Sequence, residues 1–174
     1  VYKRQVQGNS LSQSWTRNVA GGEAMAWAID FSPQDQTYTV AYNRPNEGVI
    51  TDFFHDSGAI NWYSPVPQNV SSLRWSPQST VLAVGLYEPG RLLMVDSAGG
   101  ILSDYGWHGI VSNNKAYPSD ITAIAIDDQG LKFATSGKDG AIVLSDPADG
   151  PVTTTLNPDK SKTDLFNISI GIGF

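Results

Sequence analysis

The sequence predicts an all-β protein built from a repeated unit of about four short strands. Three observations support this: apolar residues alternate with period two, turn residues recur at matching places, and the pattern repeats at intervals of roughly 45 to 50 residues. The 174 residues include 17 glycines and 10 prolines, which fits frequent turns. A hydrophobic share of 40% and a charged share of 16% are typical of a folded chain.

The repeat is clearest in short segments that share one alternating apolar pattern. In each segment the third and fifth residues are large and apolar, so both lie on the same face of a strand. These segments are Trp27–Phe31, Ser71–Trp75, Thr122–Ile126 and Ile170–Phe174. We expect each of them to be the equivalent strand of a successive unit.

A turn and a second strand follow the first three of these segments. Each turn begins with Ser or Asp, and two continue with Pro, whose fixed φ suits the second position of a type I turn. The turns are Ser32–Asp35, Ser76–Ser79 and Asp127–Gly130. Second strands are predicted at Tyr38–Ala41, Leu82–Gly85 and Phe133–Ser136. Val81–Leu86 is almost continuously apolar, as expected of a strand covered on both faces.

Two further strands complete each unit. Third strands are predicted at Val49–Phe54, Arg91–Val95 and Ala141–Ser145, and fourth strands near Ala59–Tyr63, Ile101–Tyr105 and Val152–Leu156. The tripeptide Lys138–Gly140 is a strong hairpin signal, because glycine supplies the positive φ that such turns need. Four residues are interpreted as structural repeat positions at strand ends or turns: Asp56, Asp96, Asp139 and Asp146.

Four antiparallel strands per unit are typical of a β-propeller blade. Blades are expected at approximately residues 25–65, 69–107 and 120–157, with the next beginning at 166–174. Leu11–Thr16 is predicted to be the outer strand of a preceding blade, and residues 1–10 to be unstructured or foreign to the fold. Residues 11–174 are therefore predicted to form a partial propeller, about three near-complete blades plus parts of two others. A closed propeller needs about four to eight blades, so we expect a fragment of a longer chain.

Residues 121–146, reading ITAIAIDDQGLKFATSGKDGAIVLSD, resemble a WD40 repeat through its third strand. Asp139 takes the position of the family's hairpin Asp, and Ser145 and Asp146 stand where the family has Trp-Asp. The Gly-His dipeptide that precedes WD40 repeats is absent, as is the Trp of Trp-Asp. The resemblance covers roughly residues 25–174 and implies a propeller. A rival resemblance, of Asp56–Trp62 to quinoprotein-type propeller repeats, occurs once.

Composition and motifs argue against several function classes. The net charge of −6 and the absence of a basic stripe argue against nucleic-acid binding. No apolar run reaches the roughly 18–20 residues of a membrane-spanning helix. The chain lacks Cys, and His55 and His108 make no metal-site pattern, so no metal or cofactor is expected. No nucleophile elbow or phosphate loop is present, which favours a non-catalytic protein.

Aromatic and charged residues on one set of loops suggest a binding surface. In a propeller the connections between blades, such as Ser103–Asp120 here, share a face with the loops between second and third strands. Aromatic residues and Arg commonly anchor interfaces. The candidate binding residues on this face are Arg44, Tyr87, Glu88, Trp107, His108 and Tyr117.

The hypothesis is a scaffold that binds a protein or peptide partner. In a simpler interpretation Trp107 only fills the gap between two blades. Two other functions stay open: a quinoprotein-like or other propeller enzyme whose active site lies largely outside this segment, and a purely structural spacer domain.

Overall fold

A computed structural model of the chain describes residues 2–7, 10–16, 24–45, 47–87, 90–112, 115–130, 132–146 and 152–156. Side chains are described for residues 24–45, 47–87, 90–104, 108, 119–130 and 132–145. This part of the chain is all-β and contains no helix. No helix within it is therefore long and apolar enough to cross a membrane.

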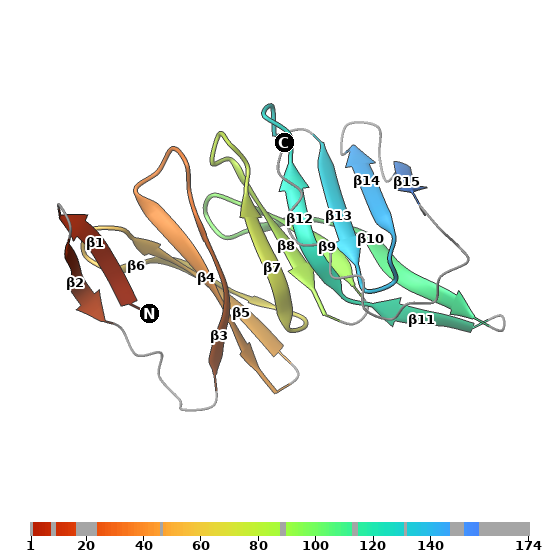
Figure 1. Cartoon of the computed structure of the whole chain (residues 1–174), viewed down its shortest axis with the longest axis horizontal. Coiled ribbons are helices and arrows are strands. Elements are labelled where there is room, and N and C mark those ends of the chain that lie inside the picture. Colours follow the sequence, from red (N-terminus) through yellow and green to blue (C-terminus); the bar gives the residue numbers. More distant parts are fainter. Residues whose placement is uncertain are drawn as a thin grey trace.

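Three antiparallel sheets stand side by side in the order of the chain (Figure 1). The first sheet contains β3 (Met25–Phe31), β4 (Thr37–Arg44), β5 (Glu47–Phe54) and β6 (Ile60–Val66). The second contains β7 (Val70–Trp75), β8 (Val81–Leu86), β9 (Arg91–Asp96), β10 (Ile101–Ser112) and β11 (Lys115–Ser119). The third contains β12 (Ile121–Ile126), β13 (Phe133–Gly137), β14 (Ile142–Asp146) and β15 (Val152–Leu156).

Apart from the extension of β10 and the additional strand β11, the strands of these sheets lie within a few residues of the bounds that the repeat predicts. In each sheet the strands follow one another in sequence, each hydrogen-bonded to the next. Over the described residues the sheets do not close into a ring. The predicted inner strand at Ile170–Phe174 lies outside the described residues.

Two expectations were wrong. Ser103–Asp120 is not a loop, because β10 runs on to Ser112 and pairs with β11, with Ile110 opposite Tyr117. In this β-hairpin the backbone N–H and C=O groups hydrogen-bond to each other, whereas in an extended loop they would hydrogen-bond to water. Tyr2–Gln7 forms strand β1 and pairs with β2 (Ser10–Thr16), so residues 2–7 are not unstructured. The alternative, that residues 1–10 are foreign to the fold, stays a prediction.

The first strand of every sheet carries a β-bulge at the same repeat position. The residues at which the pairing register shifts are Trp27 in β3, Ser71 in β7 and Thr122 in β12. A bulge inserts one extra residue into a strand and redirects its side chain. The three first strands, called inner strands below, therefore share a backbone irregularity as well as an apolar pattern.

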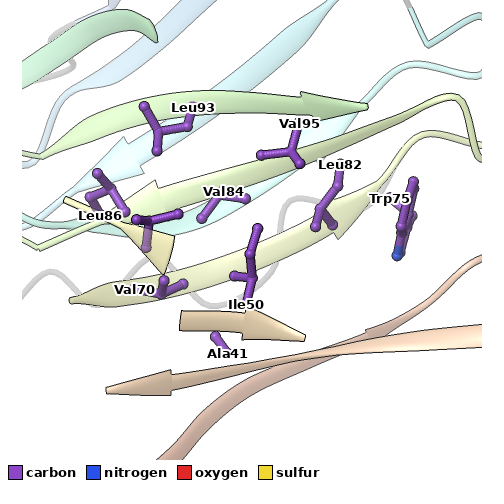
Figure 2. Packing of buried hydrophobic residues seen from close by; sticks show 10 residues of the cluster. Ala41, Ile50, Val70, Trp75, Leu82, Val84, Leu86, Leu93 and Val95 are labelled. Atoms are coloured by element: carbon purple, nitrogen blue, oxygen red, sulfur yellow. The ribbon is translucent and has the colours of Figure 1, made fainter. Parts of the chain in front are cut away.

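The core lies between neighbouring sheets. Ala41, Ile50 and Val66 of the first sheet pack against seven buried residues of the second: Val70, Trp75, Leu82, Val84, Leu86, Leu93 and Val95. Figure 2 shows most of these side chains gathered between the two sheets. A similar cluster joins the second sheet to the third and includes Met94, Ile126 and Phe133. Full burial of each large side chain contributes roughly 1.5–3 kcal/mol.

A buried polar network fixes how Trp75 sits in the junction between the first two sheets. The indole Nε1–H of Trp75 donates to Thr39 Oγ1 at 3.0 Å, and the Thr39 hydroxyl donates to Asp52 Oδ1 at 2.8 Å. The second Asp52 oxygen accepts a hydrogen bond from Asn61 Nδ2 at 3.0 Å. Asp52 is only 1% exposed, and its burial raises the pKa of the carboxyl above 3.8. The backbone N–H of Trp75 is also held, by Asp30 Oδ2 at 2.7 Å.

Glutamine side chains link the turns that follow the inner strands. Gln34 Nε2 donates to the carbonyl of Pro77 at 3.1 Å, and Gln78 Nε2 donates to the carbonyl of Asp128 at 2.7 Å. The two glutamines occupy equivalent turn positions, and so do the two acceptors. We call this series the glutamine ladder. It connects each turn to the corresponding turn of the next sheet.

The raised pKa of Asp52 predicts how stability changes with pH. Because the folded chain favours the protonated carboxyl, the contribution of Asp52 is fully present below 3.8 and is lost as pH rises through the raised pKa. The side chain of the Asp52→Asn variant cannot ionise. As pH rises from 3.8 through the raised pKa of Asp52, the free energy of unfolding of the variant should therefore increase relative to that of the wild type. Urea unfolding of both proteins in acidic and neutral buffer measures the difference. A difference that stays constant or changes in the opposite direction contradicts this account.

Candidate functional site

The bulge of β3 holds a side chain unlike those of the other two bulges. Ser71 and Thr122 are small, and the Thr122 hydroxyl donates to the carbonyl of Ser136 at 3.1 Å. The equivalent residue in the first sheet is Trp27, which is 50% exposed. A large, half-exposed aromatic residue at this position is not required by the packing of the repeat, so it is the strongest candidate for a functional side chain.

Trp27 belongs to a cluster that draws on all three sheets. Its ring meets the ring of Tyr87 edge-on, with centroids 5.7 Å apart and an angle of 70° between the planes. Lys138 Nζ lies 5.6 Å from the centroid of Tyr87, a cation–π arrangement. The same ammonium donates to Asp120 Oδ2 at 2.5 Å. We call Trp27, Tyr87, Lys138 and Asp120 the Trp27 cluster.

The backbone places these residues through equivalent connections at the end of each second strand. Tyr87 follows β8, and its N–H donates to the carbonyl of Asn69 at 2.8 Å. Lys138 follows β13, and its N–H donates to the carbonyl of Asp120 at 3.1 Å. In both sheets this bond fixes the residue after the second strand to the residue before the inner strand. The cluster therefore lies at the edge of the sheets where the second strands end and the inner strands begin, and these backbone hydrogen bonds hold it in place.

The cluster combines an apolar surface with a cation. Trp27 and the Lys138 side chain are half or more exposed, whereas Asp120 is buried beneath the ammonium. Partial burial raises the pKa of the Tyr87 phenol above 10.0, with Lys138 acting in the opposite direction. The phenol is therefore protonated at neutral pH. Such a site can stack an apolar group on Trp27 and hold an oxygen acceptor beside Lys138.

Of the residues predicted to bind, Tyr87 lies in the Trp27 cluster. Arg44 is the exposed last residue of β4, and its Nη1 pairs with Glu47 Oε1 of β5 at 3.2 Å. Glu88 lies outside the described residues. Trp107 and Tyr117 lie in strands β10 and β11 rather than in a loop, and their side chains lie outside the described part.

His108 is buried, which corrects the prediction that it lies on an exposed loop face. It is 2% exposed, because the segment predicted as a loop is a strand packed against the third sheet. Its Nε2 lies 2.8 Å from Thr135 Oγ1, and its Nδ1 lies 3.1 Å from Asp139 Oδ1. Asp139 Oδ1 also accepts the N–H of Ala141 at 3.0 Å. This arrangement has the residue types of a hydrolase triad, and all three side chains are buried.

The other aspartates singled out at strand ends have different surroundings. Asp96 Oδ1 accepts the N–H groups of Ala98 at 2.9 Å and Gly100 at 2.7 Å, which closes the turn between β9 and β10. Asp56 is exposed and lies 3.5 Å from Nδ1 of His55. Asp146 ends β14, and its side chain lies outside the described residues. Among the side chains that are described, no group of three or more metal-ligating residues comes together.

No known protein-family model matches this chain, and no curated protein resembles it significantly in sequence. The interpretation of the site therefore depends on its own geometry. Trp27, Lys138 and Asp120 were not among the candidate binding residues that the sequence suggested. Aligning the repeats could have flagged Trp27, since the equivalent residues are Ser71 and Thr122.

The buried His108 network predicts a stability effect. His108→Ala would leave Thr135 and Asp139 without a hydrogen-bond partner that they now have, which typically costs about 1–3 kcal/mol. His55→Ala, at a half-buried turn position, is the comparison and should cost less. Urea unfolding of both variants measures the two losses. Equal losses would mean that the His108 network does not hold the second and third sheets together.

Proposed function

We propose that the chain is an arc of a β-propeller that binds a protein or peptide partner through the Trp27 cluster and performs no catalysis itself. The observation that carries the proposal is the bulge in β3, which holds a half-exposed Trp27 against Tyr87. Bulges often redirect a side chain at a functional site. The partner would be an extended segment with an apolar side chain.

The propeller interpretation is supported by the repeat itself. Sheets of sequentially paired antiparallel strands stand side by side, and inner strand β7 contacts inner strands β3 and β12. In a propeller, inner strands surround a central channel, and the loops preceding them share a face with those between second and third strands. The Trp27 cluster takes its loop residues from both kinds of connection. The resemblance of residues 121–146 to a WD40 repeat agrees with this arrangement.

The chemistry of the cluster favours binding. Tryptophan and tyrosine bury a large area at modest entropic cost and are enriched among the residues that dominate interface energies. Lys138 would hold a backbone carbonyl or a carboxylate of the partner next to the aromatic surface. The only carboxylate of the cluster is engaged by that lysine, and the Tyr87 phenol is protonated at neutral pH. Neither group is prepared to act as a base or nucleophile.

Selection of a displayed peptide library on the immobilised chain tests this proposal. Peptides that bind the wild type should lose about 30-fold or more in affinity for Trp27→Ala, and a substantial part of it for Lys138→Ala. Leu102→Ala removes an exposed apolar side chain of β10 outside the cluster and should bind as the wild type does. Circular dichroism and thermal unfolding check that all three variants fold. Selected peptides that bind Trp27→Ala as tightly as the wild type would refute the proposed site.

A further inference from the structure

The aromatic surface of the Trp27 cluster is open on one side. Trp27 is 50% exposed, and its ring meets the Tyr87 ring edge-on at 70°. A ligand can therefore stack on Trp27 only from the solvent side, and such a contact buries little area. A flexible segment loses more conformational entropy on binding than a segment that is already extended in solution. The small contact area thus favours a ligand that is ordered before it binds.

A segment in the polyproline II (PPII) conformation has this property. Proline fixes φ at about −65°, so a proline-rich segment is extended before it binds, and aromatic side chains commonly bind such segments. The dimensions of the cluster also agree. The Trp27 ring centre and Lys138 Nζ lie 5.7 Å and 5.6 Å from the centre of the Tyr87 ring, a separation comparable to one PPII turn of about 9 Å.

The charge of Lys138 is compensated within the protein. Its Nζ lies 2.5 Å from Asp120 Oδ2, and the Asp120 side chain is 10% exposed. Arg44, which ends the second strand of the first sheet, pairs likewise with Glu47 at 3.2 Å. The whole chain carries a net charge of −6. An acidic ligand would therefore gain little from the cations at this edge, and the field of the whole chain would repel it.

A lysine compensated in this way can still bind a neutral oxygen. An ammonium has more than one N–H donor, and the Lys138 side chain is 64% exposed, so it can donate to an acceptor in addition to Asp120. The carbonyls of a PPII segment make no hydrogen bonds within the segment and can accept one from Lys138. The electrostatics of the cluster therefore suit a backbone carbonyl better than a carboxylate.

We propose that the partner segment is uncharged, proline-rich and in the PPII conformation, and that Asp120 determines this specificity. A proline ring stacks on Trp27, and a backbone carbonyl accepts a hydrogen bond from Lys138 Nζ. Asp120 acts through Lys138, because its carboxylate compensates the charge that would otherwise attract acidic segments. This specificity rests on the proposed function, since both use the same cluster.

Titration of the whole chain with three decapeptides, followed by NMR, tests the class of ligand. All three have blocked ends: the first is all proline, the second has glycine at every second position, and the third has two glutamates among prolines. The wild type should bind the all-proline peptide about fivefold or more tightly than either of the others, and Trp27→Ala should weaken that binding about tenfold or more. Equal affinity of the wild type for the glycine-containing peptide would overturn the PPII assignment.

Asp120→Asn tests the residue that determines specificity. The variant keeps the size of the side chain and removes its charge, so affinity for the glutamate-containing peptide should rise about three- to tenfold, and high salt should abolish the increase. Asp128→Asn removes the same charge from the exposed turn after β12 and should leave the order of the three affinities unchanged. Circular dichroism checks that both variants fold.

Two results would overturn the role of Asp120. One is an Asp120→Asn variant that folds and has the affinities of the wild type for all three peptides. The other is a wild type that prefers the glutamate-containing peptide to the all-proline peptide, a measurement that does not depend on how any variant folds.

Peptides selected from a displayed library separate this inference from the proposed function. Selected peptides that need Trp27 but contain no proline, together with an all-proline peptide that does not bind, would overturn the PPII assignment and leave the binding function intact. Selected peptides that bind Trp27→Ala as tightly as the wild type would overturn both.

Discussion

The structure depends on one packing constraint: the second sheet is apolar on both faces, so it needs a neighbouring sheet on each side. β8 shows this most clearly, since Leu82, Ala83, Val84 and Leu86 are completely buried although consecutive side chains point to opposite faces. A single sheet cannot cover itself, and the chain meets the requirement by placing its sheets next to one another in sequence order. The Thr39–Asp52–Trp75 network and the glutamine ladder then fix the alignment of neighbouring sheets.

The candidate site follows from this arrangement. Side-by-side packing brings the inner strands together and puts equivalent connections at the same edge, so Tyr87 and Lys138 approach although they are far apart in sequence. The repeated bulge adds a position whose side chain does not belong to either packed face. In two sheets that position holds a hydroxyl residue, whereas in the first it holds Trp27. In the proposed function, binding therefore depends on a residue that departs from the repeat, held on a scaffold that the repeat builds.

Period-two alternation and turn residues predicted the strands well, because apolar burial controls both the sequence pattern and the sheet. The sequence did not reveal that β10 continues into a hairpin with β11, since the aromatic and glycine residues around Trp107 resemble a loop. That error placed His108 at the surface, when its partners Thr135 and Asp139 lie in the next sheet. The Trp27 cluster was only partly predicted, through Tyr87. Its contacts depend on a bulge and on the approach of separate sheets, neither of which is visible in a local pattern.

The most direct test of the central claim is a crystal structure of the chain bound to a peptide selected for affinity. We expect the peptide to lie across the edge formed by the three sheets, with an apolar side chain against the Trp27 ring and an oxygen acceptor within hydrogen-bonding distance of Lys138 Nζ. The same structure would show whether β3, β7 and β12 lie next to one another with their bulges aligned. A peptide bound elsewhere, with Trp27 packed into the protein interior, would contradict the account.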